Sequence, residues 1–299
     1  MTSPNSSSSL PPASPPSSQW QRLLKNVGTW QGSFTRCSPE GKVLSETPTE
    51  VELSPYDGDQ AMHQEVRRYP VGEPPNIQTL DYRTLNRATR FFENGAFSQG
   101  SLQWGPYSTF GAELGLIKGH RRLRLVQLFD NTSALSQLTL IRERLKESSA
   151  PERPQLQPSD LLGRWRGHAT TQYANLSPET TCITQLTLEA IGTDQLRQTL
   201  LFADKSLEDN RNLSISSTGT IQGQKILFTQ SEPPIQVICL PDGAAATGPT
   251  AIVPKQPLFL EVGWLLSPTT RQRLIRRYDA AGAWESLTLV TEEKVAEAS

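Results

Sequence analysis

The chain has 299 residues, with 29 Lys and Arg against 30 Asp and Glu and a net charge of −1. This balance offers no electrostatic reason to expect a nucleic acid as partner. No apolar run approaches the roughly 20 residues that a membrane-spanning helix needs, so we expect no membrane span. The three cysteines are widely spaced, which fits reduced thiols in the cytoplasm and not a disulfide framework.

The N-terminal end is predicted to contain a tail and then a short helix. Residues 1–18 are rich in Ser and Pro and have no apolar core, so we expect a disordered tail and no secretory signal. Residues 20–27 place four apolar side chains at helical spacing, which predicts a short helix that ends at Gly28. From Trp30 onward, short apolar runs separated by turn dipeptides predict antiparallel strands.

The middle of the chain predicts a boundary between two domains. Residues 147–158 are polar and rich in Pro and Ser, which predicts a linker between one domain at residues 19–146 and another at 159–297. The second domain is longer than the first. The Gly-, Ala- and Pro-rich residues 241–257 predict a surface loop insertion that accounts for the difference.

An internal repeat relates the two domains. Residues 122–144 align without a gap on residues 271–293, with Arg, Leu, Asp, Ala, Leu-Thr-Leu and Glu at identical offsets. We interpret this as the duplication of one domain. An antiparallel sheet of this many strands exposes two edges unless it closes on itself, so we predict an all-β protein with two tandem closed barrels. The signature that opens each half is Gly-x-Trp: Gly28, Trp30, Gly163 and Trp165.

The short helix, the Gly-x-Trp and the number of strands resemble the calycin superfamily of lipocalins and fatty-acid-binding proteins. In that superfamily the tryptophan of the first strand lies beneath an arginine from a late strand. A guanidinium over an indole face contributes about 0.5–2 kcal/mol. The resemblance implies the same contact in each half: Arg122 or Arg124 over Trp30, and Arg271 or Arg273 over Trp165.

Polar residues that recur in both halves are the candidate ligand-binding residues. Arginines two positions apart lie on one face of a strand and, inside a barrel, could bind a ligand carboxylate bidentately. In the structural alternative, which we favour, one arginine of each pair covers the tryptophan and the other faces solvent. For the glutamates on the preceding strand, we favour structural pairing with the same arginines over contact with a ligand. The candidates are Arg122, Arg124, Glu113, Arg271, Arg273 and Glu261.

The sequence gives no positive sign of catalysis. None of the three histidines recurs in the other half, and the HExxH, CxxC and glycine-rich phosphate-loop motifs are absent. No spacing of His, Cys and carboxylate residues indicates a metal site. We therefore expect a binding protein without catalytic residues, cofactor or metal.

The two Gly-x-Trp starts, together with residues 96–104, 122–126 and 284–290, resemble the double-calycin proteins of cyanobacteria, a family of unknown function. Chloroplast relatives of that family include a biogenesis factor required for assembly of the ATP synthase catalytic head. The resemblance implies a non-enzymatic assembly factor whose protein partners are subunits of that catalytic head.

The strand at residues 121–124 and the closing strand also resemble the S-type phycobiliprotein lyases, which are single calycin barrels that hold a linear tetrapyrrole. This alternative implies a bilin or another small hydrophobic ligand, such as a lipid, in contact with Arg122, Arg124 and Glu113. A barrel filled by its own side chains would favour docking through outer surfaces, whereas an open cavity with Arg inside would favour a small ligand. We expect at least one filled barrel.

Overall fold

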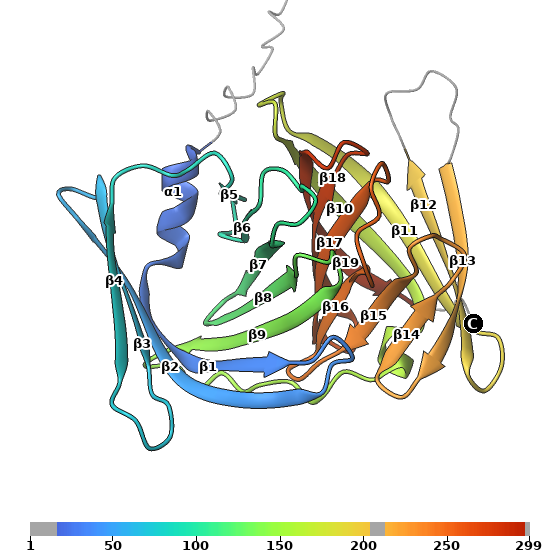
Figure 1. Cartoon of the computed structure of the whole chain (residues 1–299), viewed down its shortest axis with the longest axis horizontal. Coiled ribbons are helices and arrows are strands. Elements are labelled where there is room, and N and C mark those ends of the chain that lie inside the picture. The colour runs from blue at the N-terminus through green and yellow to red at the C-terminus, as the bar shows by residue number, and fades with distance from the viewer. Residues whose placement is uncertain (1–16, 204–212, 297–299) are drawn as a thin grey trace, which may run out of the picture.

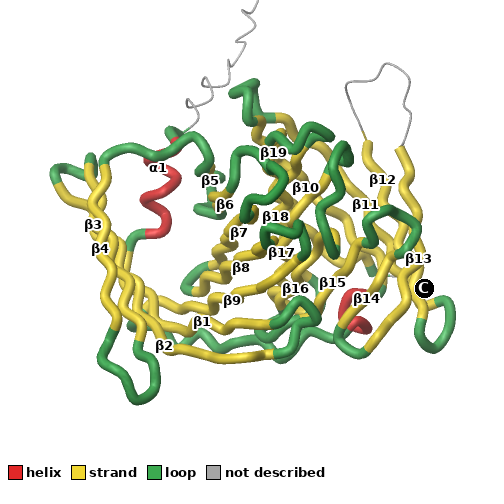
Figure 2. The backbone as a smooth tube through the Cα atoms, in the orientation of Figure 1, coloured by secondary structure: helices red, strands yellow, loops and turns green. Residues whose placement is uncertain are grey.

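The computed structural model describes residues 17–203 and 213–296, so the tail predicted at residues 1–18 lies almost entirely outside the described residues. The protein is all-β, as predicted, and short helical turns precede the first strand of each half (Figures 1 and 2). These turns are α1 (Gln19–Leu23), the 3-10 turn η1 (Leu24–Asn26) and the 3-10 turn η2 (Pro158–Leu161). Among the helices of the described residues, none has the length and apolar character needed to span a bilayer.

The first half folds into one antiparallel sheet of nine strands that curls around α1 (Figure 1). The strand order is β4-β3-β2-β1-β9-β8-β7-β6-β5, so β4 and β5 are the two edges. The strands are β1 (Gly28–Cys37), β2 (Val43–Tyr56), β3 (Ala61–Arg68), β4 (Asn76–Tyr82), β5 (Arg90–Phe91), β6 (Phe97–Gly100), β7 (Phe110–Lys118), β8 (Arg121–Phe129) and β9 (Leu135–Leu145).

The second half is a closed barrel of ten antiparallel strands, in which the last strand pairs with the first. Both halves therefore use the same pairing around their opening strand, which lies between the second strand and the last one. The strands are β10 (Gly163–Tyr173), β11 (Thr180–Ala190), β12 (Gln195–Ala203), β13 (Leu213–Gln222), β14 (Lys225–Phe228), β15 (Ile235–Cys239), β16 (Ala244–Pro249), β17 (Leu258–Ser267), β18 (Thr270–Tyr278) and β19 (Trp284–Val295).

The prediction that the first half closes into a barrel is wrong, and the reason lies at one seam. In the second half, Gly223 with a φ of +63° forms a tight hairpin that leads β13 directly into β14. In the first half, residues 83–89 separate β4 from β5 and form no hairpin, and β5 is only two residues long. The first sheet consequently stays open between these two strands.

The prediction of a loop insertion at residues 241–257 is also wrong, because this segment contains β16. Its Ala-rich sequence permits close packing: Ala244 and Ala246 are buried, and β16 pairs with both β15 and β17. The Cβ of Ala245 lies 3.4 Å from the position that a Cβ on Gly263 would occupy. Small residues that we interpreted as a sign of a surface loop instead pack within a buried strand.

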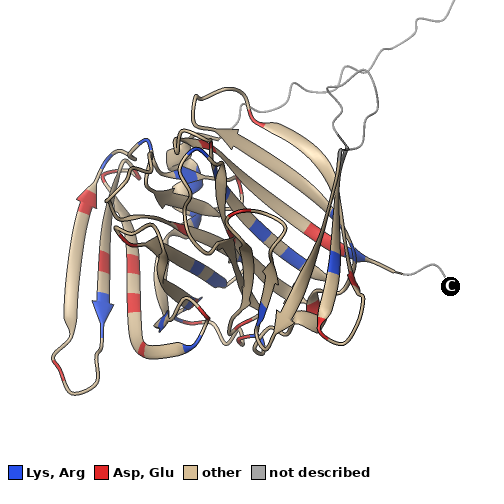
Figure 3. Ribbon diagram, turned by 45° about the vertical axis from the view of Figure 1, so that its right-hand side comes forward, with Lys and Arg blue, Asp and Glu red and all other residues tan. Residues whose placement is uncertain are grey.

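The largest hydrophobic core lies between the two halves and not inside either of them. Along β8, Leu123 and Leu125 face the second half while Arg122 and Arg124 face the inside of the first sheet. The apolar outer faces of β7–β9 and β16–β19 form one cluster, which also contains Trp264. This shared core fixes the halves against each other. Charged residues of both signs are spread over both halves (Figure 3).

Polar side chains also cross this interface at equivalent positions of the repeat. Gln127 on β8 donates to the Glu261 carbonyl at 3.0 Å, and Arg276 on β18 donates to the carbonyls of Ala88 and Ser101 at 3.1 and 3.2 Å. Arg276 is fully buried. Because each of these donors satisfies backbone groups of the opposite half, the interface is specified by hydrogen bonds as well as by apolar contact.

Candidate functional site

An indole beneath a guanidinium lies at the start of the first sheet, as the resemblance implied. Trp30 on β1 is buried, and its Nε1 donates to the Asn26 carbonyl at 2.9 Å. The Cζ of Arg122 lies 4.5 Å from the centroid of the indole ring, so Arg122 and not Arg124 makes the contact. The short helical turn before β1 therefore has a definite role, since it supplies the carbonyl that orients the tryptophan.

The second half repeats this arrangement closely. Trp165 on β10 is buried and donates from Nε1 to the Leu161 carbonyl at 2.9 Å. The Cζ of Arg271 lies 4.3 Å from the indole centroid, and the Nζ of Lys294 lies 4.8 Å from it. In both halves the acceptor is the carbonyl four residues before the tryptophan.

Two carboxylates hold the arginines of the first half. Glu143 on β9 is buried and accepts from Arg122 Nε at 2.7 Å and from Arg124 Nε and Nη2 at 3.0 and 2.8 Å. Glu113 on β7 accepts from Arg124 Nη1 at 2.7 Å and from Gln99 Nε2 at 2.8 Å. Burial alone would raise the pKa of Glu143, but its attraction to both arginines outweighs burial and lowers the pKa to about 2.

The equivalent network of the second half is looser. Glu292 on β19 pairs with Arg271 and lies 3.5 Å from Arg273 Nε, while Arg273 Nη1 lies 3.7 Å from Glu261 Oε1. Burial would raise the pKa of Glu292, but its attraction to both arginines keeps it low. For Glu261, burial raises the pKa, and the distant Arg273 offsets this only in part.

The residues predicted as candidate ligand contacts thus pair with one another, as we expected for the glutamates. The expectation that the second arginine of each pair faces solvent is wrong, because Arg124 and Arg273 lie inside and are only 11% and 14% exposed. Arg124 bonds Glu113, and Arg273 faces Glu261. Sequence reasoning missed the carboxylate at the centre of each network, although the signal was present. Glu143 and Glu292 occupy the same offset in the repeat, and a buried arginine pair needs a carboxylate to balance its charge.

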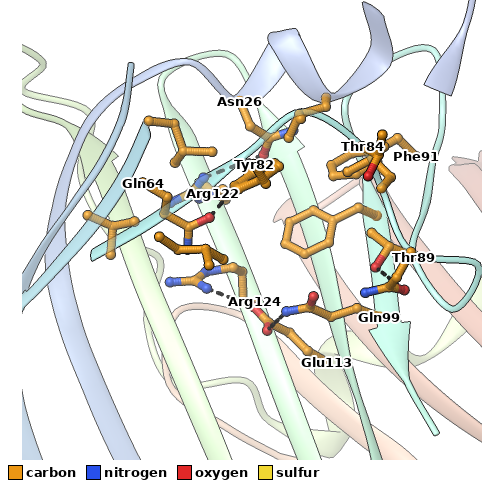
Figure 4. A pocket seen from close by; sticks show the side chains of 17 residues that line it. Asn26, Gln64, Tyr82, Thr84, Thr89, Phe91, Gln99, Glu113, Arg122 and Arg124 are labelled. Atoms are coloured by element: carbon orange, nitrogen blue, oxygen red, sulfur yellow. Dashed lines mark hydrogen bonds and ion pairs between the residues drawn. The ribbon is translucent and has the colours of Figure 1, made fainter. Parts of the chain in front are cut away.

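A cavity of about 420 Å³ lies inside the curl of the first sheet, beneath α1 (Figure 4). Its polar lining contains Arg122, Arg124, Glu113, Tyr82 and Gln64. The volume falls within the range of about 300–1,000 Å³ that is usual for ligand pockets. The apolar wall includes Leu53, Leu80, Phe91 and Phe97.

Two buried thiols have properties that oppose a nucleophilic role. Burial raises the pKa of Cys37, and burial raises the pKa of Cys239 to about 12. Both thiols are therefore protonated at neutral pH, and the thiolate is the reactive form. Within residues 17–203 and 213–296, no group of three or more His, Cys, Asp or Glu side chains is arranged to hold a metal ion.

Comparison with known proteins identifies two matching families, one for each half. Residues 16–148 match the family described as Domain of unknown function (DUF3598), N-terminal. Residues 152–295 match the family described as Biogenesis factor required for ATP synthase 1, C-terminal domain. No curated protein matches the chain.

Two matches among solved structures differ widely in strength. A protein of unknown function from the DUF3598 family of Nostoc punctiforme is 44% identical, covers 93% of this chain and 100% of its own, and superposes with a TM-score of 0.85. An S-type phycobiliprotein lyase from Guillardia theta is 11% identical, covers 47% of this chain and 91% of its own, and has a TM-score of 0.39. The second likeness supports no inference. By the first, the chain belongs to the DUF3598 family.

Proposed function

We propose that this protein is a non-enzymatic assembly factor, acting in the cytoplasm, that binds an unassembled subunit of the ATP synthase catalytic head. The observation that carries the proposal is the match of residues 152–295 to the C-terminal domain of a biogenesis factor required for ATP synthase. That segment contains the whole closed barrel.

The interior of each half supports a scaffold role for its charged residues. Arg122 and Arg124 share Glu143 in the first half, and Arg271 and Arg273 face Glu292 in the second. These groups hold strands together and cover the indoles, so their charge is already used within the fold. Recognition of a protein partner would then fall to the outer surfaces and to the open edge of the first sheet.

A binding experiment with purified components tests the proposal. The immobilised full chain is incubated with separately purified catalytic-head subunits and, in parallel, with the assembled head. We expect capture of a free subunit and much weaker capture of the assembled head, because an assembly factor must leave the finished complex. Deletion of the gene should lower the amount of assembled head. Unchanged assembly in the deletion strain, together with no captured subunit, would refute the proposal.

One observation favours a second candidate, a small-ligand carrier for a linear tetrapyrrole or a lipid. The cavity of about 420 Å³ is lined by Arg122, Arg124 and Glu113, the contacts predicted for such a ligand. Both arginines are paired, however, so a ligand carboxylate would add an unbalanced negative charge to a buried site. A native mass spectrum of protein purified from its own host tests this candidate, which predicts a retained bilin or lipid and fails if only the bare chain is present.

A further inference from the structure

The two edges of the open first sheet differ in whether they are covered. At β5, the side-chain amide of Gln19 accepts from the Phe91 N–H at 2.7 Å and donates to the Phe91 carbonyl at 3.1 Å. The same carbonyl accepts from Arg22 Nη1 at 3.2 Å and from Gln172 Nε2 at 2.9 Å. The backbone groups of β5 are therefore satisfied by side chains of α1 and of the second half, which leaves no place for another strand.

The edge of β4 is uncovered. Residues 76–81 are all exposed, and outside the β3 ladder no backbone hydrogen bond among the described residues involves residues 76–82. Helix α1 reaches only the end of this strand, where the ring of Trp20 lies 6.0 Å from that of Tyr82. Most of β4 thus presents an unpaired backbone to the outside.

The ladder geometry identifies which groups are free. The Tyr69 N–H donates to the Pro48 carbonyl at 2.9 Å, which continues the β2–β3 ladder. Pro48 and Tyr69 are therefore a hydrogen-bonded pair, and this shows which of the following pairs are hydrogen-bonded. Hydrogen-bonded pairs alternate along an antiparallel ladder. Applied through β3 to β4, this alternation places the N–H and C=O groups of Ile77, Thr79 and Asp81 at the free edge.

On the other face of β4, two side chains line the cavity. They are Leu80 and Tyr82, and Leu80 is 57% exposed. A strand added beside β4 would continue the curved sheet, so its alternate side chains would enter the same cavity. Backbone pairing combined with pockets for alternate side chains is the mode by which exposed sheet edges bind extended peptides.

The closed half of the molecule shows what occupies the equivalent seam there. β13, the fourth strand of the second half as β4 is of the first, pairs with β14. Two side chains of β14, Ile226 and Phe228, lie two positions apart and are buried in the core cluster of the second half. An extended segment with apolar residues at alternate positions therefore has the chemistry to fill the open seam at β4.

We propose that the free edge of β4 binds an extended segment of a partner protein, which adds a strand to the first sheet and inserts alternate apolar side chains into the cavity. The identity of that partner as an ATP synthase subunit rests on the proposed function. A second copy of this chain fits the edge less well, because β4 paired with itself about Thr79 would set Ile77 against Asp81.

A peptide probe tests the edge directly. The probe is a fluorescent peptide with the sequence of residues 222–230 of this chain, which contains β14. Titration with the full-length protein should give saturable binding, and hydrogen exchange should slow at residues 76–82. A control peptide carrying Ile226→Gln and Phe228→Gln should bind at least about tenfold more weakly, because its cavity-facing side chains are polar.

Matched variants separate edge pairing from general effects. Thr79→Pro removes a free-edge N–H without removing a bond to β3 and should weaken peptide binding at least about tenfold, whereas Thr79→Val keeps the N–H and should stay within about twofold. Leu80→Gln leaves the backbone intact and should weaken binding about threefold or more. Leu80→Gln therefore keeps the test decisive even if Thr79→Pro disturbs the fold.

The outcomes distinguish this proposal from the proposed function. No peptide binding, or protection away from β4, would overturn the edge proposal. A dimer whose contact protects residues 76–82 without peptide would also overturn it. If the wild type captures a catalytic-head subunit and Thr79→Pro captures it equally well, the edge proposal fails and the proposed function stands. If the peptide binds β4 but no subunit is captured, the edge proposal stands and the proposed function fails.

Discussion

The two halves of this protein share one arrangement of indole, guanidinium and carboxylate, yet only one of them closes. Trp30 with Arg122 and Trp165 with Arg271 have nearly the same geometry, including the helical carbonyl that accepts from each indole. Closure is decided elsewhere, at the seam between the fourth and fifth strands of each half, where Gly223 forms a hairpin in the second half only. A signature at the start of a barrel therefore does not guarantee its closure.

The open half has the tighter ion network. Glu143 accepts three hydrogen bonds of 2.7–3.0 Å from Arg122 and Arg124, whereas Arg273 lies 3.5 Å from Glu292 and 3.7 Å from Glu261. The first sheet lacks the hydrogen bonds that close the second barrel, and its strands β7, β8 and β9 are cross-linked by better ion pairs. We infer that the first half depends more on its charges, and the following predictions test this difference.

The largest expected effect comes from removing the central carboxylate of each network. Glu143→Ala leaves two buried guanidiniums without their shared partner and should lower the free energy of unfolding by about 3–5 kcal/mol. Glu292→Ala breaks one close pair and one long one and should cost about 2–3 kcal/mol. Urea unfolding of both variants measures the difference.

An exposed pair provides the control for this comparison. Glu285 lies 3.7 Å from Arg277, and both side chains are about half exposed. Glu285→Ala should therefore cost less than about 1 kcal/mol. Equal costs for the Glu143 and Glu292 variants would contradict the idea that the open half depends more on its charges.

Acid should affect the first half before the second. The pKa of Glu143 is lowered to about 2, so its stabilisation is complete above the ordinary glutamate pKa and is lost as pH falls toward about 2. The difference from the ordinary glutamate pKa of 4.5 corresponds to roughly 3 kcal/mol. In the second half Glu292 acts in the same direction, but the raised pKa of Glu261 acts in the opposite one, because its protonation relieves a buried charge.

The measurement is urea unfolding from about pH 6 to about pH 2.5, with pulsed hydrogen exchange that resolves β8 from β18. We expect β8 to lose protection at a higher pH than β18. Glu143→Gln should be less stable than the wild type at neutral pH and should have a weaker dependence on pH below about 4.5. A first half that keeps its protection down to about pH 2.5 would show that Glu143 does not control its acid stability.

The sequence predicted the contacts that repeat and failed where the halves differ. Trp30, Arg122 and their counterparts could be found because the same residues recur at the same offsets. The open seam could not be found, because the turn signals in residues 83–95 are compatible with either a hairpin or a longer connection. Residues 241–257 were misinterpreted because Ala and Gly are common both in loops and in closely packed strands.

The core between the halves escaped the sequence analysis for a related physical reason. In a barrel, apolar residues are expected inside and polar ones outside. Arg122 and Arg124 inside a barrel therefore imply an interior that is filled by partner side chains or by a ligand. The structure has polar residues inside the first sheet and Leu123 and Leu125 against the second half. Alternation along a strand shows that its two faces differ, but not which face meets another domain.

A smaller effect is expected from Arg22, which connects α1 to both halves. It is 3% exposed and bonds Glu93 at 2.6 Å and Glu179, in the second half, at 2.5 Å. Both carboxylates are more exposed than the arginine, so solvent weakens these pairs, and Arg22→Met should cost about 1–2 kcal/mol. Thermal unfolding measures the cost, and hydrogen exchange at residues 90–91 should accelerate. A loss below about 0.3 kcal/mol would mean that α1 is held in place by its apolar contacts alone.

A further small effect concerns the difference between the two sheet edges. Gln19→Ala removes the amide that pairs with the Phe91 N–H and carbonyl and should cost about 1 kcal/mol. Because the carbonyl keeps Arg22 and Gln172 as donors, the main change should be faster exchange of the Phe91 amide, with no change at β4. A newly opened edge should also increase self-association at high protein concentration, which light scattering can follow. If exchange of the Phe91 amide stayed unchanged, another group would be covering β5, and Gln19 could no longer explain why one edge is free to bind a strand and the other is not.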